Sequence, residues 1–523
     1  MKGRYVLGCL LSLLFAYGQP SIGLLTVEYQ PPSPPPWGFL CHCLPSTVSP
    51  ELMGTFLTLA EGDTMTAAAI QRDWLRLQSS AAFASVAYRI DTLGDNIVEL
   101  RWIVTPRCLH ALMPEVTVGA NVGNGGLALQ LSHIWGMGER LLLRLRYRWE
   151  LSLRWDADAD LFLPLAKSIE LNANAHLHRY RRTYTLRLSS PLSHPTFPWG
   201  WGAQWGREQG TSWDFRGQDF PPYRRHSHHL TAWFRWGTQQ QDQLFITIAA
   251  IAQPASTDPG YRQAFDDTAL LLFGIGSLAQ RPHSVPSPYV AAESCAVVTG
   301  AWGAVTLGIG FPIGPTGERL SYIGGELEQS LGKEWLLLSG RIAAGNAFVQ
   351  RIPRYTALET SLSGWLAFPA TPLLLFWEGY HCNVWNWPAY RAERLDFLSG
   401  FPAPFPSPAA DNRMELRTEL RWRGKAFERE ADWTLSLFHH VGTIWNQGIR
   451  LTHARFQNVV GAGIRMHIGR KHLLQWGIRA EVGYSFTLHR VLPTLRIELS
   501  DLPKTLHRYR LPQPLGKPQV AAP

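Results

Sequence analysis

Residues 141–155 read LLLRLRYRWELSLRW, and this stretch decides the fold class. Every odd position carries Leu, Tyr or Trp, whereas the even positions from 144 to 154 carry Arg, Arg, Arg, Glu, Ser and Arg. An apolar residue at every second position predicts a β-strand with one apolar and one polar face. The large apolar side chains need a protein core or lipid beside them, and the arginines need water or counter-charges.

The composition describes an ordered, basic and aromatic-rich chain. It has 523 residues, of which 22 are Trp and 46 are Gly, and only 17% are charged. Low charge combined with many aromatic residues argues against disorder. The net charge is +9, but arginines that alternate along strands do not form the contiguous basic cluster that nucleic-acid binding requires. We therefore expect no nucleic-acid partner.

Residues 1–22 have the pattern of a secretory signal peptide. Lys2 and Arg4 precede an apolar run over residues 5–17, and small and turn-forming residues follow. Such a run is too short to cross a bilayer as a stable helix. A later uncharged run at 296–314 contains five glycines and a proline, a content that suits two strands and a turn better than a helix. The sequence therefore predicts an exported protein without a helical anchor.

A spacer and a small domain are predicted between the signal peptide and residue 107. The prolines at 31–36 indicate a Pro-rich spacer over residues 23–37. Residues 38–107 combine helical spacing over 67–83 with two strands, over 84–92 and 96–104, that are joined by a turn containing Gly-Asp-Asn. This pattern predicts a compact α+β domain, near the lower size limit for a self-sufficient core.

The remainder of the mature chain is predicted to be a transmembrane β-barrel. Period-two alternation recurs in strands of about ten residues or more, the length that a tilted membrane strand requires. Aromatic residues gather at 197–206 and 380–390, which resembles the aromatic girdles of membrane proteins. A soluble β-sandwich also alternates, but strand length and girdles favour the barrel. The predicted fold is thus mainly β: an antiparallel barrel preceded by one small α+β domain.

Length sets the expected number of strands. The barrel is assigned to residues 108–500 and a Pro-rich basic tail to 501–523. At about 25 residues for each strand and its connection, the barrel has roughly sixteen strands, an even number as bacterial barrels require. The expected loops are the polar or Pro-rich stretches 206–228, 253–268, 280–288 and 379–412.

No motif asks for catalysis, a cofactor or a metal. Cys41 and Cys43 flank His42 but lack a third ligand at zinc spacing. His439 and His440 point to opposite faces of a strand and cannot chelate together. The histidines at 226–229 have no acidic partner at diagnostic spacing. A nucleophile elbow, a phosphate loop and a helical Glu/His metal pair are all missing. We expect a protein that is not an enzyme and uses no cofactor.

Residues 59–104 resemble a POTRA domain, the small periplasmic module of the outer-membrane assembly and secretion superfamily that contains BamA, TamA and the two-partner-secretion transporters. The resemblance lies in Gly62-Asp63 before a helix, in Phe83 after it, and in Val86 at the start of the next strand. Two barrel segments are also similar to this superfamily: 134–147, with a Gly-x-Gly turn before a long strand, and 459–485, with Gly461, Gly463 and Arg465. The resemblance implies a divergent member of this superfamily with a single POTRA domain.

The same superfamily folds an extracellular loop into the barrel, and its tip has a Val-Arg-Gly-Phe-like sequence. The similar segment here is Leu398, Ser399, Gly400 and Phe401. In the family, the arginine docks on an aspartate in a Phe-x-Asp-x-Gly-like strand, which is similar here to Phe438, His440 and Gly442. Both charges are absent together, which avoids stranding a buried charge. Either Ser399 and His440 form a neutral hydrogen bond, or the register of the loop is different.

The resemblance implies a non-enzymatic outer-membrane protein that inserts or secretes polypeptides. Its POTRA domain would lie in the periplasm of a Gram-negative bacterium, and the strand edge at 84–91 would capture unfolded outer-membrane or secreted clients by β-augmentation. The barrel would open between its first and last strands, near 116–123 and 494–500, and periplasmic accessory proteins are possible partners. The motif and edge residues are Gly62, Asp63, Phe83, Val86, Tyr88 and Ile90.

Two alternatives come from the strand pattern and the predicted surface location. A passive, anion-favouring channel would use arginines that face the lumen, and a surface antigen or adhesin would use the barrel only as an anchor. The predicted lumen-facing arginines are Arg144, Arg146, Arg148, Arg154, Arg417 and Arg421.

Overall fold

The structure is a computed structural model of the chain. It describes residues 20–30, parts of 57–77, 83–106 except 95, and most of 110–499. The gaps in the last range are 120–122, 133–138, 149–153, 167–168, 179, 191–198, 214–221, 239–241, 259–264, 287–293, 387–392, 395–408, 426–430 and 469–475. The predicted signal segment before residue 20, Cys41 and Cys43, the loop tip 398–401 and the tail 501–523 lie outside the described residues. The chain divides into two compact units.

The N-terminal unit contains a three-stranded sheet. Its strands are β1 (Ser21–Tyr29), β2 (Phe83–Gly94) and β3 (Ile97–Pro106), in the order β1-β3-β2. β1 runs parallel to β3, and β2 runs antiparallel to it. The predicted strands at 84–92 and 96–104 are therefore confirmed. The core of this unit consists of buried apolar residues from the sheet and from the segment between β1 and β2: Ile22, Leu59, Met65, Ile70, Leu77, Phe83, Val86, Val98, Leu100, Trp102 and Val104.

One boundary of this unit was predicted wrongly. Residues 23–29, assigned to the Pro-rich spacer, belong to β1, which begins at Ser21 within the predicted signal segment. The run Ile22–Val27 is apolar and β-branched enough to form a strand, and Val27 pairs in register with Trp102 of β3. The Pro-rich composition that predicts an extended spacer is confined to residues 31–36. It gives no information about residues 23–29, which form the strand.

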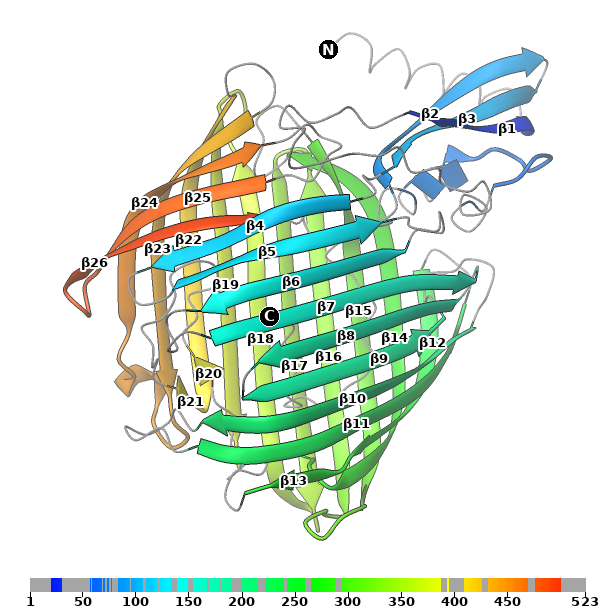
Figure 1. Cartoon of the computed structure of the whole chain (residues 1–523). Helices are drawn as coiled ribbons and strands as arrows, with labels where there is room; N and C mark the ends of the chain where they lie inside the picture. The colour runs from blue at the N-terminus through cyan, green and yellow to red at the C-terminus, as the bar shows by residue number, and fades with distance from the viewer. Residues whose placement is uncertain are drawn as a thin grey trace. The chain divides into compact units, whose positions relative to one another are not determined.

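Twenty long strands and the short segment β13 form a closed barrel (Figure 1). Each strand pairs with its neighbours along the chain, and β26 pairs with β4 to close the ring. The barrel strands are β4 (His110–Gly119), β5 (Gly123–Ser132), β6 (Arg140–Arg148), β7 (Arg154–Ala166), β8 (Ile169–His178), β9 (Arg181–Ser189), β10 (Trp199–Trp213), β11 (Pro222–Gly237), β12 (Asp242–Gln253), β13 (Ala255–Thr257), β14 (Thr268–Pro286), β15 (Ser294–Pro312), β16 (Leu320–Lys333), β17 (Leu336–Val349), β18 (Ile352–Ala367), β19 (Leu373–Trp385), β22 (Asn412–Lys425), β23 (Ala431–Trp445), β24 (Gln457–Ile468), β25 (Trp476–Ser485) and β26 (Arg490–Leu499).

The short elements β20 (Glu393–Arg394) and β21 (Ala409–Ala410) pair with each other, and a single 3₁₀ turn, η2, spans Leu451–His453. No helix in the described part of the chain is long and apolar enough to span a membrane.

The predicted closed antiparallel barrel is confirmed, but the expected count of about sixteen strands was wrong. Several connections are far shorter than assumed. β17 and β18 are joined by Gln350 and Arg351 alone, whose φ angles of 50° and 70° make a tight hairpin turn. Two predicted loops are largely strand: β10 and β11 occupy most of 206–228, and β14 extends through residue 286. The difference arises because strand ends in this barrel carry polar side chains, so polarity alone does not indicate a loop.

Because neighbouring strands are antiparallel, the connections alternate between two ends of the barrel. We call them the Trp199 end, where β11–β12, β16–β17 and β18–β19 connect, and the Trp385 end, where β10–β11, β15–β16 and β19–β22 connect. Exposed aromatic residues gather at both. Those at the Trp199 end are Trp199, Trp236, Trp335, Phe368 and Trp422, and those at the Trp385 end are Phe311, Trp385, Phe456 and Phe486. The two rings match the aromatic girdles of membrane barrels.

Candidate functional site

The joint that closes the barrel is its shortest main pairing among those whose register is described. Thr494 to Ile497 of β26 pair with Gly119 to Val116 of β4, which gives four registered pairs. β25 and β26 share ten pairs, and the other long-strand pairings with a described register have eight or more. We call this four-pair ladder the joint. Its two strands correspond to the predicted opening near 116–123 and 494–500.

Prolines lie close to both limits of the joint. Pro493 directly precedes Thr494, the first paired residue of β26. Continuing the register by two residues beyond Ile497 and Val116 places Leu499 opposite Pro114 of β4. Proline has no backbone N–H and cannot donate to a ladder. The sequence therefore limits how far this pairing can extend in either direction.

Charged side chains line one wall beside the joint. On β6, Leu143 and Leu145 are exposed, while Arg144 and Arg146 lie on the opposite face. In a closed barrel the exposed apolar face points outward, so the arginines point inward. The Nε atom of Arg144 lies 3.1 Å from Oε1 of Glu115 on β4, and one of its terminal nitrogens lies 3.5 Å from Asp160 on β7. Arg146 bonds to Asp158 and lies 3.6 Å from Asp156. We call these residues the aspartate wall.

The acidic half of this wall is not among the residues predicted from the sequence. Asp156, Asp158 and Asp160 stand at every second position of RWDADADLF on β7, directly after the quoted stretch. The same alternation that placed the arginines would have placed these carboxylates on the facing strand. Arg148 and Arg154 end β6 and begin β7, and their side chains lie outside the described part of the chain.

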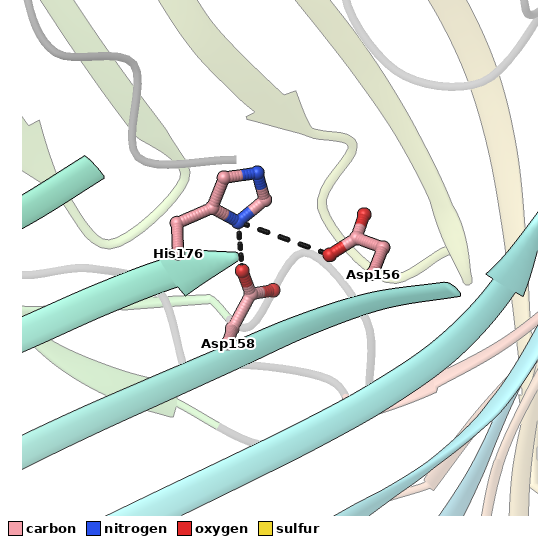
Figure 2. Close-up of side chains that lie close together, drawn as sticks. All are labelled: Asp156, Asp158 and His176. Carbon is pink, nitrogen blue, oxygen red and sulfur yellow. Dashed lines mark hydrogen bonds and ion pairs between the residues drawn. The ribbon is translucent and has the colours of Figure 1, made fainter. Parts of the chain in front are cut away.

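Figure 2 shows His176 of β8 pointing toward Asp156 and Asp158 of β7. The Nδ1 atom of His176 contacts Asp158 and lies 3.8 Å from Oδ1 of Asp156. One ligand atom from each of the three residues lies within 4.8 Å of the others, which is a possible metal-binding geometry. Arg146 already bonds to Asp158, so a cation would have to displace a guanidinium. The group is better described as an ion-paired network than as a metal site.

A second charged cluster lies on the other side of the joint, on β22, β24 and β25. We call it the arginine cluster. It consists of Arg417, Arg421, Arg465 and Arg479 around Glu419 and Glu481, and all six side chains are buried. Glu419 is the centre: Arg417 bonds to it, and the terminal nitrogens of Arg421 and Arg465 lie 2.5 and 3.1 Å from its carboxylate. The predicted Arg417 and Arg421 are thus buried and paired.

The predicted partner strand of the inserted loop borders the arginine cluster. Phe438, His440 and Gly442 lie on the buried face of β23, whereas His439 is exposed. His440 pairs in register with Arg417 of β22, and its ring centroid lies 4.9 Å from that of Phe438. The proposed contact with Ser399 lies outside the described residues. His440, the position that is acidic in the family pattern, therefore lies next to Arg417 of the arginine cluster.

In the N-terminal unit, Gly62 and Asp63 form a turn that is attached to β1. Gly62 has a φ of +90°, and its backbone N–H donates to the carbonyl of Ile22 at 2.8 Å. Phe83 and Val86 are buried in the core, while Tyr88 is 37% exposed. Ile90 is half-buried and packs against the same core. The motif residues thus hold the fold together, and Tyr88 is the accessible one.

The two faces of the N-terminal sheet differ in character. The face away from the core carries Glu99 and Arg101 on β3, whose side chains are 3.0 Å apart, with Arg89 and Asp91 beside them on β2. The hydrogen bond to Glu99 raises the pKa of Arg101 above its ordinary value.

A closed antiparallel barrel with an apolar outward face, aromatic girdles and ion-paired inner walls has the architecture of outer-membrane β-barrel proteins. Among solved structures, the chain is similar to CdiB from Acinetobacter baumannii, with a TM-score of 0.44 and 10% identity over 92% of this chain and 74% of that one. It is also similar to CdiB from Escherichia coli (TM-score 0.41, 10% identity, 91% and 76% covered) and to BamA from Haemophilus ducreyi lacking POTRA domains 1-3 (0.40, 10%, 91% and 84%). No family model and no curated protein matches the chain. We draw no functional inference from similarities of this size.

Proposed function

We propose that this chain is an outer-membrane barrel that inserts or secretes polypeptides by letting a client strand pair at the β26–β4 joint. The observation that carries the proposal is the four-pair ladder between β26 and β4, bordered by Pro493 and Pro114. An opened joint presents two strand edges. A client that pairs with them satisfies backbone groups that would otherwise be bare in lipid.

The energetics favour opening at this place. At about 1 kcal/mol net for each hydrogen bond, four registered pairs contribute roughly 4 kcal/mol, and the ten pairs of β25–β26 roughly 10 kcal/mol. The absolute values are larger in lipid, where an unpaired backbone group has no water to bond, but the ratio is retained. Thermal or client-driven separation therefore requires less free energy at the joint than between β25 and β26.

The edge of β2 is the proposed site of first client contact in a POTRA-like domain. β2 is at one end of the order β1-β3-β2. The carbonyl of Val86 accepts a hydrogen bond from the Trp74 indole at 3.0 Å. The bond shows that the backbone carbonyl of Val86 points away from β3. Because the direction of the backbone N–H and C=O groups alternates along a strand, those of Tyr88 and Ile90 also point away from β3. Since Val86 is already occupied, a client ladder would begin at Tyr88.

The orientation in the membrane follows from the barrel. Connections at the Trp199 end have nine residues or fewer, whereas those at the Trp385 end range from the two-residue β17–β18 turn to the 26 residues between β19 and β22. Outer-membrane barrels have short periplasmic turns and longer extracellular loops. The Trp199 end, where β4 begins, is therefore the periplasmic end, and we place the N-terminal domain in the periplasm.

A disulfide across the joint tests this proposal. Val118 and Leu495 face each other in the ladder and are both 40% exposed, so Val118→Cys with Leu495→Cys can crosslink the joint. The matched control is Leu437→Cys with Ala462→Cys, a register pair in the twelve-pair β23–β24 ladder. Each variant is expressed in cells depleted of the wild-type protein, and the outer-membrane and secreted proteomes are quantified.

We expect the joint crosslink to abolish complementation under oxidising conditions and a reductant to restore it, whereas the control crosslink has no effect. Full complementation by the oxidised joint variant would refute the opening mechanism. An envelope proteome that is unchanged on depletion would refute insertion and secretion altogether. The passive anion channel is less well supported, because Arg144, Arg146, Arg417 and Arg421 are paired with carboxylates.

A further inference from the structure

The outward face of β9, β10 and β11 carries a basic patch near the Trp385 end. Its members are Arg182, Arg207, Arg224, His226 and His228, all exposed. Register places them in adjacent rows: Arg207 is opposite His228, and Gln209 lies between Arg182 on one neighbouring strand and His226 on the other. Arg207 donates a hydrogen bond to Gln209 at 2.9 Å. Among the residues that the structure describes beside the patch, Asp258 is acidic, and its carboxylate accepts a hydrogen bond from the Arg224 backbone N–H.

Directly below this patch the same outward face is hollowed. A groove of about 540 Å³ extends across β9 to β15, within the range of roughly 300–1,000 Å³ typical of small-ligand sites. We call it the alanine groove. Apart from Gln204 and Thr231, its lining is apolar. Ala203, Ala232 and Ala250 follow one another across neighbouring strands as its floor, and Leu186, Trp205 and Leu230 form the side toward the basic patch.

The patch and the groove are one residue pair apart along the strands. The Trp205–Leu230 pair of the groove is followed on the same face by the Arg207–His228 pair of the patch, at a spacing of roughly 7 Å for two strand residues. The Trp205 ring lies 6.4 Å from the His228 ring, between the two regions. A cationic surface thus continues into an apolar groove with a tryptophan at the boundary, as at a membrane interface.

The height of the patch matches the position of lipid phosphates. Arg207 lies eight residues after Trp199 of the opposite girdle, on the same strand. At about 3.3 Å per residue and a tilt of about 40°, that separation is roughly 20 Å along the membrane normal, and the row of Arg224 is higher still. The apolar band of a membrane barrel is about 25 Å tall. The patch therefore lies at the outer boundary of the membrane, and the groove lies among the acyl chains.

We propose that the alanine groove and the basic patch together bind one phosphorylated glycolipid of the outer leaflet, of the lipid A class. Its phosphates would bond to Arg182, Arg207 and His228, and an acyl chain would lie over Ala203, Ala232 and Ala250. Charge complementarity selects an anionic head group, and a groove continuous with the acyl layer selects a lipid over free phosphate. This site is distinct from the joint: it rests on the membrane orientation proposed above but not on the proposed client path.

The test uses the purified full-length protein in detergent micelles and native mass spectrometry with bisphosphorylated lipid A as the probe. One variant combines Arg182→Gln, Arg207→Gln and His228→Asn, and a second fills the groove with Ala232→Trp. The matched controls are Arg354→Gln, an exposed arginine on β18, and Ala301→Leu, an outward position on β15 outside the groove lining. Heat-modifiable gel mobility checks that each barrel is folded.

We expect wild-type protein and both controls to retain lipid A equally. Each of the two lost arginines should weaken lipid A binding about fivefold, so the triple variant should bind roughly 25-fold more weakly. The Ala232→Trp variant should bind at least about tenfold more weakly. Unchanged lipid A binding by either test variant would overturn the proposal. So would equal binding of cardiolipin, which would indicate an unspecific anionic-lipid surface, or complete displacement of lipid A by inorganic phosphate.

Discussion

Replacing the central carboxylate of the arginine cluster should destabilise the barrel more than any other single charge removal near the joint. Glu419 is buried and bonds to Arg417, Arg421 and Arg465 from two strands, while Arg479 lies 3.8 Å away. Glu419→Gln preserves the shape of the side chain and removes its charge. Four guanidinium groups would then share Glu481 as their remaining carboxylate in the cluster.

The magnitude follows from the burial of these groups. Removing one partner of a buried ion pair costs about 3–5 kcal/mol, because the other charge stays buried without compensation. Exposed pairs contribute only about 0–1 kcal/mol. The side chains of Glu419 and Arg421 are 0% and 2% exposed, so the buried value applies. We expect Glu419→Gln to lower the free energy of unfolding by about 3–5 kcal/mol.

Urea unfolding of the protein in lipid vesicles, followed by tryptophan fluorescence, measures this loss. The matched control is Glu326→Gln: Arg341 bonds to Glu326 at 2.5 Å but keeps Glu359 at 3.3 Å, so the loss should be about 1 kcal/mol. A loss below about 1 kcal/mol for Glu419→Gln, or an equal loss in both variants, would show that water screens the cluster and that the reasoning fails.

Two further predictions concern the wall and the client edge. His440→Asp alone should be tolerated or stabilising in the same urea assay, because Arg417 lies opposite in register and the cluster has four arginines for two glutamates; destabilisation that Ser399→Arg relieves would instead support the loop contact. Tyr88→Pro should keep the circular dichroism spectrum of the N-terminal domain but lose complementation of the depleted cells, whereas Ala87→Pro should unfold the domain because residue 87 bonds toward β3; a folded Ala87→Pro variant would show that the orientation assigned to β2 is reversed.

Most of the barrel could be predicted because alternation is a local property. In 141–155 the outward Leu143 and Leu145 and the inward Arg144 and Arg146 follow from a period of two and need no long-range information. The strand count could not be obtained in this way. It depends on turn length, and a two-residue turn such as Gln350-Arg351 has no glycine, asparagine or proline to mark it.

The site was predictable only in part, since its decisive features arise between strands. Arg417 and Arg421 were identified, but the sequence alone did not show that Glu419 and two arginines from β24 and β25 converge on them. That convergence depends on register across three ladders. The basic patch could not be predicted for a related reason. The polar sequence of 206–228 predicts a loop, and the outward alignment of Arg207 with His228 exists only because these residues form paired strands.

The ion pairs explain why the joint is the place where this barrel would open. On one side, contacts from Arg465 and Arg479 to Glu419 connect β24 and β25 to β22. On the other, Arg144 connects β4 to β7 through Glu115 and Asp160. Opening between β24 and β25 would break ten registered pairs as well as buried ion pairs of the arginine cluster. Opening between β4 and β7 would break the contacts of Arg144 with Glu115 and Asp160. Opening at β26–β4 breaks four registered pairs. On the proposed mechanism, the charged walls would thus concentrate separation at one ladder.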